Sequence, residues 1–262
     1  MFGLFEALTL ESVMAELRAR GNPKSVKAMG KFGIRTDEAL GVSVPTLREI
    51  AKRVGKDHSL AIGLWKTRIH EARLLAAMVE DPRTLSVEQM DSWVEDFDSW
   101  DLCDVCCGGL FDRTPVAYVK AIEWAGRKEE FVKRAGFAMI ASLAVHDKEA
   151  EDSKFKRFFP AIERGSADER NFVKKAVNWA LRQIGKRNMD LNREAINVAG
   201  RISTKGTSAG RWVASDAIRE LKSDAVLRRL RRPSVARASR GGRYQRYRKG
   251  RNGRRPPARS SS

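Results

Sequence analysis

An apolar pattern with helical spacing recurs along the chain at intervals of about 40 residues. The segment EFVKRAGFAMIASL (130–143) and the segment NFVKKAVNWALRQI (171–184) share an opening of Phe, Val, Lys, a basic residue and Ala. Residues 1–224 show the helical period almost throughout, with no sustained alternation of apolar and polar residues. The sequence therefore predicts an all-α fold, an α-solenoid of HEAT-like repeats with two helices per unit.

Three short motifs predict where individual helices begin. The segments SVEQ (86–89) and SADE (166–169) fit the capping box, in which side chains satisfy the unpaired N–H groups of the first turn. Thr114-Pro115 has the order of a capping residue followed by proline.

The second helices of successive repeats carry mostly basic residues at equivalent positions. Laying these helices over one another aligns Arg73, Asp104, Arg134, Lys175 and Arg211. If second helices line the concave face, as they do in other solenoids, the chain has a concave basic groove that holds a single carboxylate.

That carboxylate lies in a nearly apolar helix. Trp100 and Asp104 are one helical turn apart and share a face, and Arg134 is the expected partner of Asp104 because a buried charge needs a counterion. Aromatic faces beside a carboxylate suit a bound cation. The alternative interpretation is that the tryptophans belong to the core and that Asp104 and Arg134 form a salt bridge between repeats.

A second stripe of aromatic and basic residues is expected two helical units later, with spacing i, i+3, i+7 and i+10. Its members are Phe172, Lys175, Trp179 and Arg182. Basic neighbours of aromatic residues suit phosphate groups next to a stacked base.

The three cysteines, Cys103, Cys106 and Cys107, all lie within this apolar helix. They give no disulfide framework, and the three histidines lie far from them in sequence, so ligand spacing for a metal is absent. We expect the cysteines to fill space in the core, and we expect no metal and no cofactor.

The net charge of +18 comes mostly from the C-terminus. Residues 225–262 hold fourteen Lys and Arg residues and no acid, which leaves 37 basic and 33 acidic residues for residues 1–224. This Arg/Gly/Ser-rich tail has few apolar residues, so we expect it to be disordered and to bind nucleic-acid phosphates. The alternative is a tail that only keeps the protein in solution or that binds any polyanion.

No apolar run reaches the length that crosses a bilayer, and the first residues lack a secretory pattern. We therefore expect no membrane association. The expected location is the cytoplasm or nucleoid, or the nucleus if the source is eukaryotic.

Several segments together resemble the AlkD-like family of DNA alkylation-repair glycosylases, which have HEAT-like repeats. The likeness spans roughly residues 20–224. In chain order the segments are KFGIRTDEALGVSVPTLREIAKRV (31–54), WDLCD (100–104), FVKRAGFAMIA (131–141), FVKKAVNWALRQIGK (172–186) and SAGRWVASDAIREL (208–221).

The resemblance implies a monofunctional DNA-alkylpurine N-glycosylase. Members hold duplex DNA on a concave basic face and hydrolyse the N-glycosidic bond of cationic bases such as 3-methyladenine and 7-methylguanine, leaving an abasic site. Matched by position, the catalytic carboxylate is Asp104, the tryptophans flanking the lesion are Trp100 and Trp179, and the active-site arginine is Arg134. A groove built within one chain also implies a monomer.

Phe172 and Arg182 match further residues of the family's cleft. The sequence departs from the family in the first helical pair, where the stretch 23–34 offers small or basic residues at the aligned position of an aromatic one. The alternative function is a non-enzymatic HEAT-like scaffold that binds nucleic acid or protein.

Overall fold

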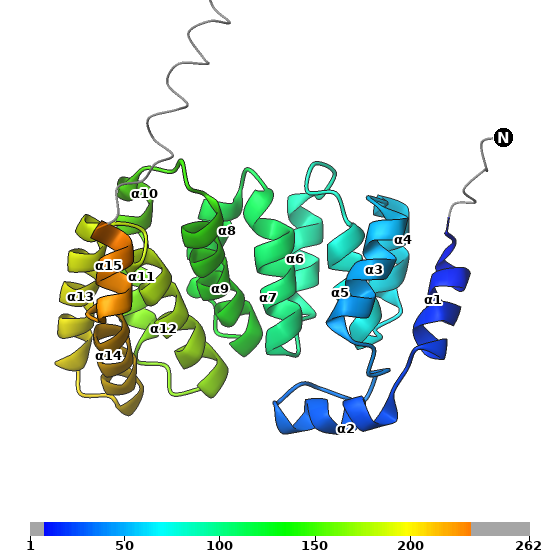
Figure 1. Ribbon diagram of the computed structural model, residues 1–262, viewed down its shortest axis with the longest axis horizontal. Helices are drawn as coiled ribbons and strands as arrows, with labels where there is room; N and C mark the ends of the chain where they lie inside the picture. The colour runs from blue at the N-terminus through cyan, green and yellow to red at the C-terminus, as the bar shows by residue number, and fades with distance from the viewer. Residues whose placement is uncertain (1–7, 232–262) are drawn as a thin grey trace, which may run out of the picture.

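The computed structural model describes residues 8–231, and the regular structure of these residues is entirely helical (Figure 1). The first helices are α1 (Leu10–Ala19), α2 (Pro23–Lys31), α3 (Val44–Val54), α4 (His58–Lys66), α5 (His70–Val79), α6 (Val87–Glu95) and α7 (Trp100–Gly109). A 3-10 turn, η1 (Phe111–Arg113), precedes α8 (Ala117–Ala125), α9 (Glu130–His146), α10 (Asp152–Lys156) and α11 (Phe159–Gly165). The last helices are α12 (Asn171–Gly185), α13 (Met189–Ser203), α14 (Ser208–Leu221) and α15 (Asp224–Arg231).

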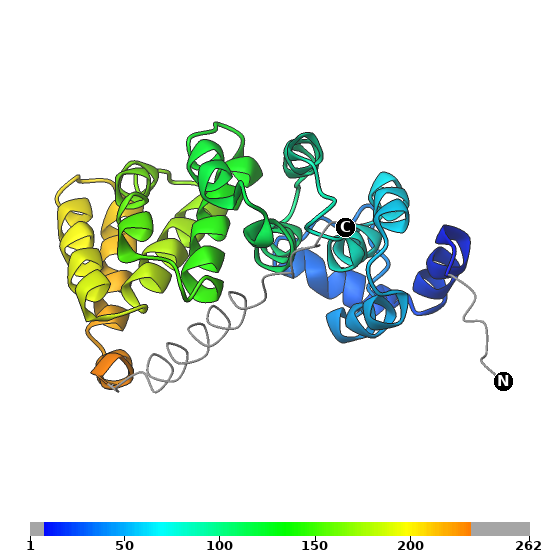
Figure 2. The same ribbon diagram turned by 90° about the horizontal axis from the view of Figure 1, so that it is seen from above.

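The helices form two adjacent rows. One row, here called the inner row, runs through α3, α5, α7, α9, α12 and α14, each packed against the next. Helices α4, α8 and α13 lie against α5, α9 and α14 as their outer partners. Seen from above, the stack bends with the inner row on the inside of the bend (Figure 2). This arrangement confirms the predicted solenoid of helical pairs.

Helix α9 is the centre of the core. It packs against α7, α8 and α12, and most of its side chains are buried on every side. Gly136 permits this packing, because a Cβ at this position would lie 2.7 Å from Ala125 Cα and 2.8 Å from Ala121 O of α8. The apolar character of 130–143, which recurs in 171–184, thus reflects a helix enclosed by neighbours.

Helix α2 stands apart from both rows (Figure 1). None of its residues is buried, and Lys24, Lys27 and Lys31 follow the i, i+3, i+7 spacing of one helix face. The loop that follows it is fixed to the body through Glu71, whose carboxylate accepts hydrogen bonds from the backbone N–H groups of Leu40 and Gly41 at 2.8 and 2.6 Å.

One of the three predicted helix starts is correct. Ser86 caps α6, and its side chain accepts a hydrogen bond from the N–H of Gln89 at 3.1 Å. Ser166 instead ends α11, and Thr114 donates its hydroxyl to the carbonyl of Phe111 rather than capping α8. Both wrong predictions fall in turns that use polar side chains to end a helix.

The boundary of the predicted tail is also corrected, because residues 225–231 belong to α15. Val226 is buried, and Ser223 caps the helix by accepting a hydrogen bond from the N–H of Val226. The rest of the predicted tail lies outside the described residues. Among residues 8–231, no helix has the length and apolar character needed to span a bilayer.

Candidate active-site cleft

Asp104 and Arg134 form an ion pair across the inner row. Arg134 Nη2 of α9 donates to Asp104 Oδ1 of α7 at 2.7 Å, as predicted from the repeat pattern. The guanidinium is 6% exposed, whereas the carboxylate is 27% exposed. The pair is therefore asymmetric: the cation is enclosed in protein and the anion is open to a ligand.

Burial raises the pKa of the Asp104 carboxyl above its ordinary value, and the charge and hydrogen bond of Arg134 counteract this effect. A second bond fixes Arg134, because its Nη1 donates to the carbonyl of Phe172 at 2.9 Å. One arginine thus links α7, α9 and α12 and fixes the position of the carboxylate.

Aromatic residues lie on the same helices as this pair and on the segment after α2. Trp100 is the first residue of α7, and its indole N–H donates to the carbonyl of Phe32 at 3.0 Å. The neighbouring Gly33 lies against Phe172, since an added Cβ would be 2.7 Å from Phe172 Cζ. The segment that follows α2 thus contacts both α7 and α12. We call Trp100, Asp104, Arg134, Phe172 and Phe32 the Asp104 cleft.

Phe32 is a cleft residue that the sequence interpretation missed. Its side chain is 68% exposed, although its backbone is held by Trp100. The stretch 23–34 therefore supplies an aromatic residue beside the predicted tryptophan, where only small or basic residues were expected. The available signal was an aromatic residue directly before a glycine, Gly33, which adopts a positive φ of 72°.

Helix α12 bears the second predicted stripe. Trp179 is partly buried and packs against the core, which leaves part of its surface exposed. Lys175 is exposed and forms no ion pair within residues 8–231. Arg182 is ion-paired with Glu220 and lies 3.6 Å from Asp216, both of α14. A DNA phosphate at Arg182 would have to compete with these two carboxylates.

Arg73, which was predicted to contact DNA, is nearly buried. Its side chain is 6% exposed, and Nη2 donates to Asp96 Oδ2 at 3.2 Å while the guanidinium carbon lies 5.2 Å from the ring of Trp65. The contacts with Asp96 and Trp65 hold the Arg73 guanidinium against α4 and the end of α6. Arg211 is exposed at the start of α14, so its predicted contact with DNA stays a prediction.

The cysteines are core residues, as predicted. Cys103, Cys106 and Cys107 are fully buried and unpaired, and burial raises the pKa of the Cys106 and Cys107 thiols. The described residues contain no cluster of His, Cys, Asp and Glu that could hold a metal ion.

A buried pair, His70 and Asp101, lies beside the cleft and was also missed. His70 Nε2 and Asp101 Oδ2 are 2.9 Å apart, and His70 is 5% exposed. Burial lowers the pKa of His70, but the hydrogen bond and charge of Asp101 raise it by more. Burial likewise raises the pKa of Asp101, and the bond to His70 outweighs this and lowers it. The pair therefore favours an ionised histidine and carboxylate.

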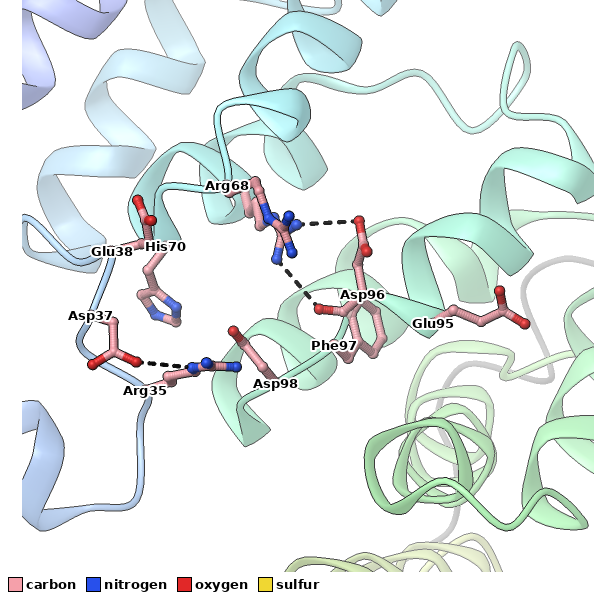
Figure 3. A pocket seen from close by; sticks show the side chains of 10 residues that line it. Arg35, Asp37, Glu38, Arg68, His70, Glu95, Asp96, Phe97 and Asp98 are labelled. Atoms are coloured by element: carbon pink, nitrogen blue, oxygen red, sulfur yellow. Dashed lines mark hydrogen bonds and ion pairs between the residues drawn. The ribbon is translucent and has the colours of Figure 1, made fainter.

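His70 also lines a polar pocket with a volume of about 430 Å³ (Figure 3). It is lined mainly by charged side chains, including the ion-paired Arg35 and Asp37. Asp104 is not among its lining residues. The Asp104 cleft is therefore distinct from this pocket, and its carboxylate is 27% exposed.

Comparison with known proteins explains this arrangement. A family model described as DNA alkylation repair enzyme matches residues 13–221. The chain belongs to this family. The predicted resemblance is thereby confirmed at the level of the family.

A solved structure described as belonging to "a new family of proteins related to the HEAT-like repeat DNA glycosylases with affinity for branched DNA structures" is similar to this DNA alkylation repair family member in fold. The TM-score is 0.67, with 20% sequence identity over 80% of this chain and 94% of that chain. At this identity the likeness supports the fold alone. A comparison with curated proteins gave no match.

Proposed function

We propose that this member of the DNA alkylation repair enzyme family is a monofunctional glycosylase that removes cationic alkylated purines from duplex DNA. The products are the free base and an abasic site. The observation that carries the proposal is the partly exposed Asp104 carboxylate, fixed at 2.7 Å from the buried Arg134 and next to Trp100. The family match and the HEAT-like fold support it.

The chemistry needs few catalytic groups. An alkylated purine such as 7-methylguanine carries a positive charge, so it leaves with the bonding electron pair as a neutral base. Positive charge develops on the sugar as an oxocarbenium ion, and water adds to C1′ and loses its proton. A fixed anion near C1′ stabilises that charge and orients the water. Asp104 supplies the anion, and Arg134 keeps it ionised and positioned.

The aromatic residues provide selectivity for the damaged base. A cationic purine is attracted to the face of an indole ring, whereas a normal purine lacks this charge. Trp100 contacts the nucleotide from α7, and Trp179 from α12. The protein needs no resident metal or organic cofactor for this reaction and acts as a monomer, in the cytoplasm or nucleoid, or the nucleus if eukaryotic.

The test is base release from duplex DNA that carries a single 7-methylguanine, compared with the same duplex carrying 8-oxoguanine, which is uncharged. We expect release of the charged base alone. Duplex binding without release of either base would instead support the alternative function, a non-enzymatic HEAT-like scaffold.

The basic tail is proposed to add affinity for DNA phosphates. Truncation after Arg231 removes the tail and retains α15. We expect weaker binding to undamaged duplex and a smaller slope of log affinity against log salt, because each lost phosphate contact lowers the slope by about 0.9. An unchanged slope would show that the tail does not bind DNA.

A further inference from the structure

Helix α14 places a tryptophan on the surface of the inner row, beyond the Asp104 cleft. Trp212 is 41% exposed, while its neighbours Val213 and Ala214 are 0% and 1% exposed and face the core. Within residues 8–231 its ring meets no other aromatic ring, and its recorded ring contact is the Lys174 ammonium at 5.5 Å. Trp212 is thus an aromatic face open to solvent beside a cation.

This residue continues a line of aromatic side chains along one edge of the inner row. Three aromatic residues lie in the first turns of α7, α9 and α12, namely Trp100, Phe131 and Phe172. Trp212 lies in the second turn of α14. The rings of Phe131 and Phe172 are 5.5 Å apart. Because these helices are packed in order, the line leads from the Asp104 cleft to Trp212.

Basic residues lie at the α14 end of this line of aromatic residues. The Lys174 ammonium lies 5.5 Å from the Trp212 ring, Lys175 follows it on α12, and Arg211 directly precedes Trp212 on α14. None of these three pairs with a carboxylate within the described residues. Elsewhere on the same two helices, Arg182 and Lys186 are ion-paired with Glu220. The free cations are therefore concentrated around the exposed tryptophan.

We propose that Trp212 and its cations form a second nucleic-acid site, which binds an unpaired nucleotide of a DNA strand that leaves the duplex. Trp212 lies away from the Asp104 cleft, where the damaged nucleotide is proposed to meet Trp100 and Trp179. The undamaged bases of an intact duplex are stacked and paired, so Trp212 can stack only on a base of a single-stranded segment. Aromatic residues alternating with cations are the usual means of holding such a strand.

The preferred DNA would then be a branched or forked molecule, with the duplex at the Asp104 cleft and one arm at Trp212. This inference rests on the proposed function in one respect: it assumes that duplex DNA binds along the inner row. The affinity for branched DNA described for the protein of similar fold agrees with it.

The experiment measures fluorescence anisotropy of a labelled fork with a single-stranded arm and of a linear duplex of the same length. Trp212→Ala should weaken binding of the fork about tenfold, within the range of one base stacked on an aromatic ring, and leave the linear duplex unaffected. Trp212→Phe should retain most of the affinity. Val119→Ala, a change at a side chain 66% exposed on the outer helix α8, is the control and should have no effect.

The inference is overturned if Trp212→Ala binds the fork like the wild type, or if it weakens fork and linear duplex equally. If Trp212→Ala unfolds early in a thermal melt, Lys174→Glu replaces it, and loss of fork affinity is again expected. Equal competition by polyglutamate and by oligothymidylate would also contradict stacking, because polyglutamate offers charge alone. Base release from the linear 7-methylguanine duplex is measured in parallel, so that failure of the proposed function is recorded separately.

Discussion

The contact between Gly33 and Phe172 should be essential to the Asp104 cleft, and Gly33→Ala tests it. Gly33 has a φ of 72°, which costs an alanine about 1–2 kcal/mol. The new Cβ would also lie 2.7 Å from Phe172 Cζ, whereas ordinary contact begins at 3.4 Å, so the two must separate by about 0.7 Å. Either the ring or the end of α2 has to move within the cleft.

Two effects should follow from Gly33→Ala. The free energy of unfolding should fall by about 1–2 kcal/mol, or about 2–8 °C in melting temperature for a domain of this size. The rate of base release should fall about 10- to 100-fold, because a misplacement near 1 Å can cost about 100-fold in catalysis. Single-turnover release from the 7-methylguanine duplex and a thermal melt measure the two effects.

Gly55→Ala is the matched control. Gly55 also has a positive φ, 76°, but no atom lies within 4 Å of an added Cβ. This variant should also lose stability, because an alanine rarely adopts a φ of 76° with a ψ of −143°, and it should keep the wild-type rate of base release. If both variants release base equally fast, the end of α2 plays no part in the cleft, and this reasoning is refuted.

Three further predictions concern packing and charge. Gly136→Ala should lower the free energy of unfolding by about 1–3 kcal/mol in a urea titration, because the methyl group collides with the backbone of α8. Arg134→Met should move the acid limb of the pH–rate profile to higher pH, since the pKa of Asp104 loses the cation that lowers it. His70→Gln should destabilise the protein most between about pH 4 and 6.5, where His70 and Asp101 are both ionised even in the unfolded chain.

The sign of the last prediction follows from the two pKa shifts. The raised pKa of His70 gives stability below about pH 6.5 that is lost as the pH rises through its folded pKa. The lowered pKa of Asp101 gives stability above about pH 3.9 that is lost as the pH falls. A stability difference from wild type that grows above pH 8 would contradict the pairing. An unchanged urea midpoint for Gly136→Ala would contradict the predicted collision with α8. An unchanged acid limb for Arg134→Met would contradict the effect of Arg134 on the pKa of Asp104.

The helical rows could be predicted from sequence because their cause is local periodicity. The segments 130–143 and 171–184 have the same apolar pattern because α9 and α12 are neighbours in one row. The Asp104–Arg134 pair followed from the same alignment, since equivalent positions on adjacent helices face each other. The local signal SVEQ at 86–89 likewise gave a helix start.

The missed features depend on contacts that no local pattern contains. Phe32 reaches the cleft only because α2 leaves the solenoid and returns through a loop held by Glu71. Arg73 has the spacing of a groove residue, but Asp96 from another repeat holds it inside. The start of the tail was misplaced because the burial of Val226 depends on the position of α15 against α13 and α14.

The most direct test of the central claim compares the wild type with Asp104→Asn, which keeps the shape of the side chain and removes its charge. Glu95→Gln on α6, 58% exposed and outside the Asp104 cleft, controls for the loss of one carboxylate. Duplex binding and single-turnover release of 7-methylguanine are measured for each protein. We predict that Asp104→Asn binds the duplex and releases base at least about 100-fold more slowly than the wild type. Glu95→Gln should release base at the wild-type rate. Release by Asp104→Asn at the wild-type rate would contradict the assignment of Asp104 as the catalytic carboxylate.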